Sequence, residues 1–171
     1  MNRITPQQII LFVIYLLYQV MILQNVVVYH TAFCFLYVLY LILLPVESNP
    51  IVLMGFGFLM GLCVDMFYES VGLHAFASVM IMYVRNYWLN SLTPQGGYDS
   101  NSVPSVAMNG VQWFLVYAVP LIFLHHALLF FLEAGGFGMF WFTLWKIITS
   151  TLFTVLVILI AQFLFPSRKP R

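Results

Sequence analysis

Residues 55–77 read GFGFLMGLCVDMFYESVGLHAFA, and the expected fold is built outward from this stretch. Gly57, Gly61 and Asp65 are spaced four residues apart, so an α-helix places all three within about 80° of arc. Glycines at this spacing let a second helix approach closely. A polar break follows, and a second apolar run opens at Gly72. The stretch therefore predicts two membrane helices joined by a short turn.

The composition is that of an integral membrane protein. The chain has 171 residues, of which 63% are hydrophobic and 6% are charged, whereas soluble domains carry about 25% charged residues. The length fits one membrane domain over residues 1–171, with about five to seven spans of about 20 residues each. A net charge of +1 does not indicate the excess of basic residues that is typical of nucleic-acid binding. The two cysteines, Cys34 and Cys63, lie in apolar runs and are expected to be small buried hydrophobes.

The apolar runs predict an all-α, polytopic fold with six transmembrane helices. The spans are expected at residues 9–28, 32–44, 51–65, 71–88, 111–132 and 140–165. The first run lacks a cleavage site, so we interpret it as a retained span. The second and third runs have only about 14 residues, which is short for a bilayer core of about 30 Å. The polar segment 90–108, rich in Gly, Pro, Asn and Ser, predicts a loop.

The placement of Lys and Arg predicts the orientation. With six spans, both termini and the 90–108 loop share one side, and that side holds five basic residues: Arg3, Arg85, Arg168, Lys169 and Arg171. The positive-inside rule then places both termini in the cytoplasm. We expect Arg85 and the neighbouring aromatic rings to reach the lipid headgroups. Asp65, Glu69 and Glu133 fall on the opposite, outer side.

The glycine ridge, residues Gly57, Gly61 and Asp65, allows two interpretations. It either packs against another helix of the same chain or forms a contact with a partner protein or a polar functional site. Placing an acidic side chain at the membrane boundary costs free energy, and this cost favours a functional role for Asp65. We expect Gly72 to adopt a backbone conformation that a residue with a side chain would disfavour. His74 is expected to hydrogen-bond to Asp65 across the turn, as a structural link or for proton chemistry.

The last expected span carries a polar stripe within about 80° of its helical wheel: Thr143, Lys146, Ser150 and Thr154. Such a stripe is expected to face the bundle or a cavity and not lipid. Lys146 needs an anionic or carbonyl partner, as an internal link or a substrate ligand. The candidates are Asp65, Glu69 and Glu133, and we single out Asp65.

No metal, cofactor or catalytic constellation is predicted. His125 and His126 are adjacent in the sequence, which is poor metal-ligand geometry on a helix. The chain contains no nucleophile elbow, zinc motif or phosphate-binding loop.

At Gly61-Leu62-Cys63-Val64-Asp65, followed by Gly72-Leu73-His74-Ala75, the sequence resembles the bacterial rod shape-determining MreD family. Arg85 also falls where that family often has a basic residue. The resemblance implies a bundle similar to the six-helix substrate-binding components of ECF-type vitamin transporters. It also implies a noncatalytic subunit of the cell-elongation complex in the inner membrane, which supports peptidoglycan synthesis. The expected partners are membrane lipid, MreC and, through MreC, MreB, RodA and its penicillin-binding transpeptidase.

Two further function classes compete with this scaffold. The first class is a small-molecule-binding component of an ECF-type transporter. Such proteins usually dock on their transporter through small residues on their first span. Residues 9–28 contain no Ala or Gly, which argues against this class. A membrane enzyme is the second, and it lacks a visible catalytic constellation.

Overall fold

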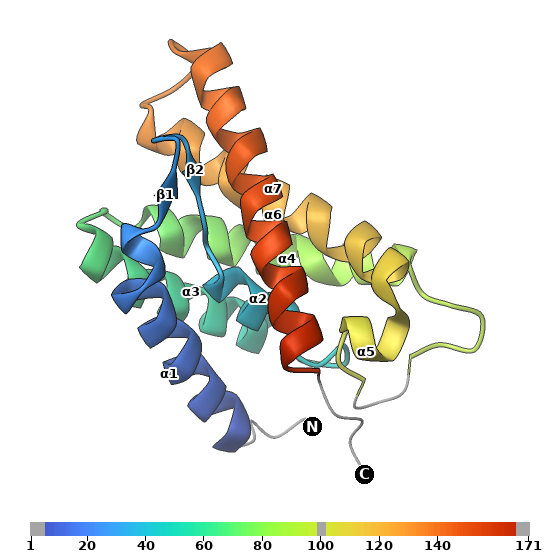
Figure 1. Ribbon diagram of the computed structural model, residues 1–171. Coiled ribbons are helices and arrows are strands. Elements are labelled where there is room, and N and C mark those ends of the chain that lie inside the picture. The colour runs from blue at the N-terminus through green and yellow to red at the C-terminus, as the bar shows by residue number, and fades with distance from the viewer. Residues whose placement is uncertain (1–5, 99–101, 167–171) are drawn as a thin grey trace.

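The computed structural model describes residues 6–98 and 102–166 and is mostly helical (Figure 1). Its elements, in chain order, are α1 Pro6–Met21, the 3-10 helix η1 Leu23–Asn25, β1 Val27–Val28, β2 Ala32–Phe33, α2 Tyr37–Ile42, α3 Pro50–Tyr68, α4 Leu73–Ser91, α5 Val106–Asn109, α6 Val111–Glu133 and α7 Phe140–Leu164. The all-α expectation therefore holds except for a small antiparallel hairpin, in which Val27 pairs with Phe33 and Val28 with Ala32.

Among the described residues, four helical segments are long and apolar enough to cross a membrane: Pro6–Asn25, Pro50–Tyr68, Val111–Glu133 and Phe140–Leu164. The helix α4 is as long as α3. It is less apolar, because it carries His74, Arg85, Asn86 and Asn90.

The prediction of one continuous helix over residues 32–44 is wrong. The chain is non-helical from Ala32 to Phe35, and the α-helix α2 has only six residues. All six are buried, so this helix lies in the centre of the bundle. Extended backbone rises about 3.3 Å per residue and helix about 1.5 Å. A straight segment with four extended and nine helical residues spans at most about 27 Å, against about 20 Å for thirteen helical residues.

Buried non-helical backbone needs hydrogen-bond partners, and side chains of α1 and α7 supply them. The Phe33 amide donates to Ser150 Oγ at 3.0 Å, and the Phe35 amide donates to Thr154 Oγ1 at 3.2 Å. From the other side, Gln19 Nε2 donates to the Cys34 carbonyl at 3.0 Å. The polar stripe thus faces the bundle, as expected, and its partner there is the backbone of β2 and the residues that follow.

The bundle has two ends, which we name the loop end and the hairpin end. At the loop end, the α2–α3 connection meets the segment before α5, because the Val46 amide donates to the Ser102 carbonyl at 3.1 Å. The end of α7 lies there too, with Gln162 accepting from the Val106 amide at 3.2 Å. At the hairpin end, Gln24 of η1 donates to the Phe67 carbonyl at 2.8 Å. The start of α1 and the end of α7 lie at the same end of the molecule (Figure 1).

Candidate functional site

The α3–α4 junction, residues 65–75, carries the densest polar network at the hairpin end. Asp65 is 3% exposed and accepts four hydrogen bonds. Two come from the first turn of α4: the His74 amide reaches Oδ1 at 3.0 Å, and the Ala75 amide reaches Oδ2 at 2.9 Å. Because the N-cap residue Gly72 has no side chain to cap the helix, Asp65 fills that role from the preceding helix.

His74 completes this network. Its Nδ1 lies 2.9 Å from Asp65 Oδ1, so the expected hydrogen bond across the turn is confirmed. The Ser70 hydroxyl donates to the same carboxylate oxygen at 2.6 Å and lies 3.0 Å from His74 Nδ1. A serine nucleophile would need its hydroxyl on the imidazole nitrogen opposite the carboxylate. Ser70 instead shares the same nitrogen as Asp65, which is the geometry of a structural link.

Backbone conformation closes the turn between the two helices. Glu69 ends α3 in the left-handed region with φ +53°, and Gly72 opens α4 with φ +75°. The expected need for a residue without a side chain at Gly72 is confirmed by this positive φ.

The glycine ridge packs inside the chain. A methyl group at Gly61 would lie 2.5 Å from the Ala75 nitrogen and the His74 carbonyl oxygen. A methyl group at Gly57 would lie 2.9 Å from the Ser78 carbonyl oxygen. Both residues, like Asp65, are buried against α4. Of the two interpretations, packing within the chain therefore applies, and the ridge itself is not free to receive a partner.

Lys146 pairs with a different acid from the one singled out. Its Nζ lies 2.7 Å from Glu133 Oε2, at the α6–α7 turn. The ammonium also lies over two aromatic rings, 4.7 Å from the centroid of Phe33 and 4.2 Å from that of Phe130. Glu133 is close because α6 and α7 are antiparallel neighbours. The four hydrogen bonds that Asp65 accepts come from α4 and Ser70.

Both groups line one pocket of about 100 Å³. Ser70, His74, Glu133 and Lys146 all contribute to its lining, together with aromatic rings. The structure thus brings Asp65, His74 and Lys146 to the same end of the bundle. The His74 Nε2 atom is buried and has no hydrogen-bond partner among the described residues.

Arg85 does not lie at the lipid headgroups, as was expected, but inside the bundle. The side chain is 0% exposed, deep on the inner face of α4. Its Nη2 donates to the Leu44 carbonyl, and its Nε donates to the Tyr117 hydroxyl at 2.8 Å. Tyr117 donates in turn to the Ile42 carbonyl at 2.8 Å. Arg85 therefore caps the C-terminal end of α2, where a positive charge is stabilised by the helix dipole.

Gln19, His125 and His126 are buried polar residues that have structural roles and were not singled out as site residues. Gln19 binds the non-helical backbone, as described above. His125 Nε2 lies 2.6 Å from the Tyr37 hydroxyl, and His126 Nε2 lies 3.2 Å from Thr154 Oγ1. The sequence feature that could have indicated these roles is an uncharged polar side chain inside an apolar run. Within the described residues, no group of three or more metal-ligating side chains forms a metal site.

No protein-family model, curated protein or solved structure matches the chain in the three comparisons made. The function is therefore argued from the residues and their geometry.

Proposed function

We propose that this protein is a noncatalytic, six-crossing subunit of a bacterial cell-elongation complex, built like an ECF-type substrate-binding component. The observation that carries the proposal is the α3–α4 junction. The residues of the MreD-like motif, Gly61, Asp65, Gly72 and His74, form a compact link in which the acid is committed to the backbone of α4. That arrangement favours a rigid scaffold over a reactive site.

The alternation of the connections between the two ends of the bundle supports the proposed six crossings. In chain order, the connections between α1, residues 32–44, α3, α4, α6 and α7 alternate between the hairpin end and the loop end. The central segment reaches nearly the thickness of the hydrocarbon core. Its non-helical backbone is buried in protein, which is the condition under which such backbone is tolerated at membrane depth. With the positive-inside rule, the loop end and both termini are cytoplasmic.

The surface offered to MreC is the outer face of α1. Of the four long apolar segments, this one is the least buried within the chain. Its outward side chains include Ile10, Ile14, Leu17 and Met21, at successive turns of the helix, and each is at least 45% exposed. The ridge on α3 is already covered by α4 and cannot serve this purpose.

Co-purification with MreC tests the proposal. We expect the wild-type protein to retain MreC, and Ile14→Trp with Leu17→Trp to lose it while the protein remains folded. The matched control is Leu152→Trp with Leu156→Trp, because these side chains are exposed on α7. Absence of MreC from the wild-type sample would refute the proposal, and loss with the control pair alone would place the contact on α7.

A second candidate is a small-molecule-binding component of an ECF-type transporter. The observation in its favour is the pocket lined by His74 and Lys146. Its volume of about 100 Å³ is below the roughly 300 Å³ at which ligand pockets begin. A stoichiometric vitamin in the purified protein would place this candidate first.

A further inference from the structure

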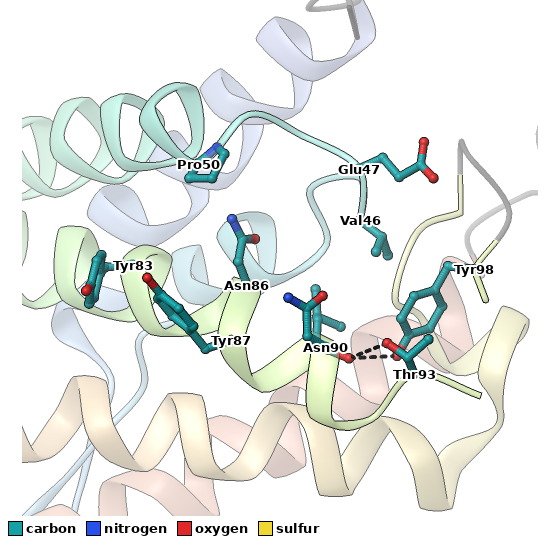
Figure 2. A pocket seen from close by; sticks show the side chains of 10 residues that line it. Val46, Glu47, Pro50, Tyr83, Asn86, Tyr87, Asn90, Thr93 and Tyr98 are labelled. Carbon is teal, nitrogen blue, oxygen red and sulfur yellow. Dashed lines mark hydrogen bonds between the residues drawn. The ribbon is translucent and has the colours of Figure 1, made fainter. Parts of the chain in front are cut away.

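The two ends of the bundle expose different kinds of surface. At the loop end, polar side chains of α4, namely Asn86, Asn90 and Thr93, help to line a pocket of about 540 Å³ (Figure 2). At the hairpin end, residues 134–145 contain no charged residue and read AGGFGMFWFTLW. We name this segment, which joins α6 to the first two turns of α7, the aromatic tip. Turns in water are typically built from Gly, Pro, Ser, Asn and Asp, whereas this one combines its glycines with five aromatic rings.

The rings of the aromatic tip are not buried by the rest of the chain. Phe137, Trp141 and Trp145 are 71%, 79% and 59% exposed. Figure 1 shows that α7 begins beyond the β1–β2 hairpin, so the hairpin does not cover its first turns. Soluble proteins rarely expose a large contiguous apolar patch, and such patches mark contacts with a protein or a membrane.

The directions of the rings favour lipid over a protein partner. Phe140, Trp141 and Phe142 are consecutive, and each is at least 41% exposed. Successive residues of a helix are about 100° apart, so these three rings leave α7 on different sides. A packed partner helix covers one side of its neighbour. A lipid layer surrounds a helix and can cover all three.

The length of α7 places part of it outside the hydrocarbon core. Its 25 residues extend about 37 Å, whereas the core is about 30 Å thick and the bilayer with its headgroups about 40–45 Å. Both tryptophans of α7 lie in its first two turns. Because tryptophan is enriched where hydrocarbon meets headgroups, the excess length is best placed at the beginning of α7.

The ion pair at the base of the tip sets the level from the other direction. Glu133 immediately precedes the aromatic tip and Lys146 immediately follows it, and their side chains are paired at 2.7 Å. The Glu133 side chain is 51% exposed. Exposed charge is disfavoured in hydrocarbon, and exposed aromatic rings are disfavoured in water. The headgroup layer accommodates both.

We propose that the aromatic tip is an interfacial anchor whose partner is the lipid headgroup layer at the hairpin end. The rings of Trp141 and Trp145 rest against the upper part of the acyl chains, and their indole N–H groups donate hydrogen bonds to headgroup oxygens. The anchor fixes the depth of α7, the helix that binds the backbone of Phe33 and Phe35. It needs the membrane setting but not the cell-elongation role, and its test involves no MreC.

Depth-dependent fluorescence quenching in liposomes provides the test. The variant retains Trp141 alone, through Trp88→Phe, Trp113→Phe and Trp145→Phe. Its emission should be quenched more by lipid that carries a nitroxide near the headgroup than by lipid labelled near the chain end, and least by iodide in the water. The matched control adds Leu152→Trp to a chain without other tryptophans. Leu152 is exposed on the same helix, about 16 Å further along it, so the order of the two lipid quenchers should be reversed there.

Every other pattern for Trp141 would overturn the proposal. Quenching mainly by iodide would place the tip in water, and the order found for Leu152→Trp would place it in the hydrocarbon core. Resistance to all three quenchers would mean that a polypeptide covers it. The wild-type background gives a second comparison, because Trp88 and Trp113 are half-buried. There, Trp141→Phe with Trp145→Phe should remove most of the quenching by the headgroup-labelled lipid, and unchanged quenching would also contradict the anchor.

Discussion

The carboxylate of Asp65 caps α4 from the end of the preceding helix, and this explains why an acid closes an otherwise apolar helix. The first backbone amides of a helix have no partner within it, and in a membrane they need one. The Ser70 hydroxyl donates to the same carboxylate. One side chain thus satisfies two amides and a hydroxyl.

The closest approach of α3 and α4 makes Gly61 sensitive to a single methyl group. We expect Gly61→Ala to lower the free energy of unfolding by about 1–3 kcal/mol, because the added carbon would meet the backbone of His74 and Ala75. Gly55→Ala, on the same helix, meets nothing within 4 Å and should be nearly neutral. Thermal unfolding in detergent compares the two, and equal shifts would show that the helices do not depend on this contact.

Double-mutant cycles distinguish the partners of Asp65. Asp65→Asn combined with His74→Ala should show a coupling energy of about 0.5–3 kcal/mol, because the two side chains share a hydrogen bond. Asp65→Asn combined with Lys146→Met should be additive within about 0.5 kcal/mol, because Lys146 pairs with Glu133. Coupling in the second cycle and not in the first would reverse the assignment made here.

At the scale of elements, the unusual feature is the segment from β2 to α2. Residues 32–35 of this segment are non-helical, and the hydroxyls of Ser150 and Thr154 on α7 accept hydrogen bonds from the Phe33 and Phe35 amides. A polar stripe on a membrane helix can thus hydrogen-bond to backbone as well as line a cavity. Arg85 does the equivalent at the other end of α2, where it donates to the Leu44 carbonyl just beyond the helix, and Tyr117 donates to the carbonyl of Ile42, the last residue of the helix.

Two threonines three residues apart on α7 test this interpretation. Thr154→Val removes the acceptor of the Phe35 amide and should lower the free energy of unfolding by about 1–3 kcal/mol. Thr151 is also buried, but its hydroxyl has no hydrogen-bond partner among the described residues. Thr151→Val should therefore be neutral or stabilising. Chemical unfolding of both variants measures the difference, and an equal cost would mean that the hydroxyl of Thr154 contributes nothing specific.

At the scale of the whole molecule, the question is whether residues 32–44 cross the membrane. In a variant with Cys34 and Cys63 replaced, we expect Tyr29→Cys and Ser48→Cys to react with an impermeant thiol reagent from opposite sides. Phe137→Cys should behave like Tyr29→Cys, and Gln95→Cys like Ser48→Cys. These positions lie at the hairpin end and the loop end respectively. Labelling of Tyr29→Cys and Ser48→Cys from one side would reduce the number of crossings.

The sequence by itself indicated a composition typical of membrane proteins, the long apolar segments and the Asp65–His74 hydrogen bond, and it left open whether the glycine ridge packs within the chain. Each follows from composition or from residues near one another along the chain. The partner of Lys146, the burial of Arg85 and the non-helical central segment were decided by the tertiary structure. Those features depend on which helices lie side by side, because a buried charge or an unpaired backbone amide takes its partner from a neighbour distant in sequence. For Asp65, the sequence indicated the hydrogen bond to His74. The packing of α4 against α3 also brings the carboxylate to the first amides of α4, so that Asp65 caps this helix.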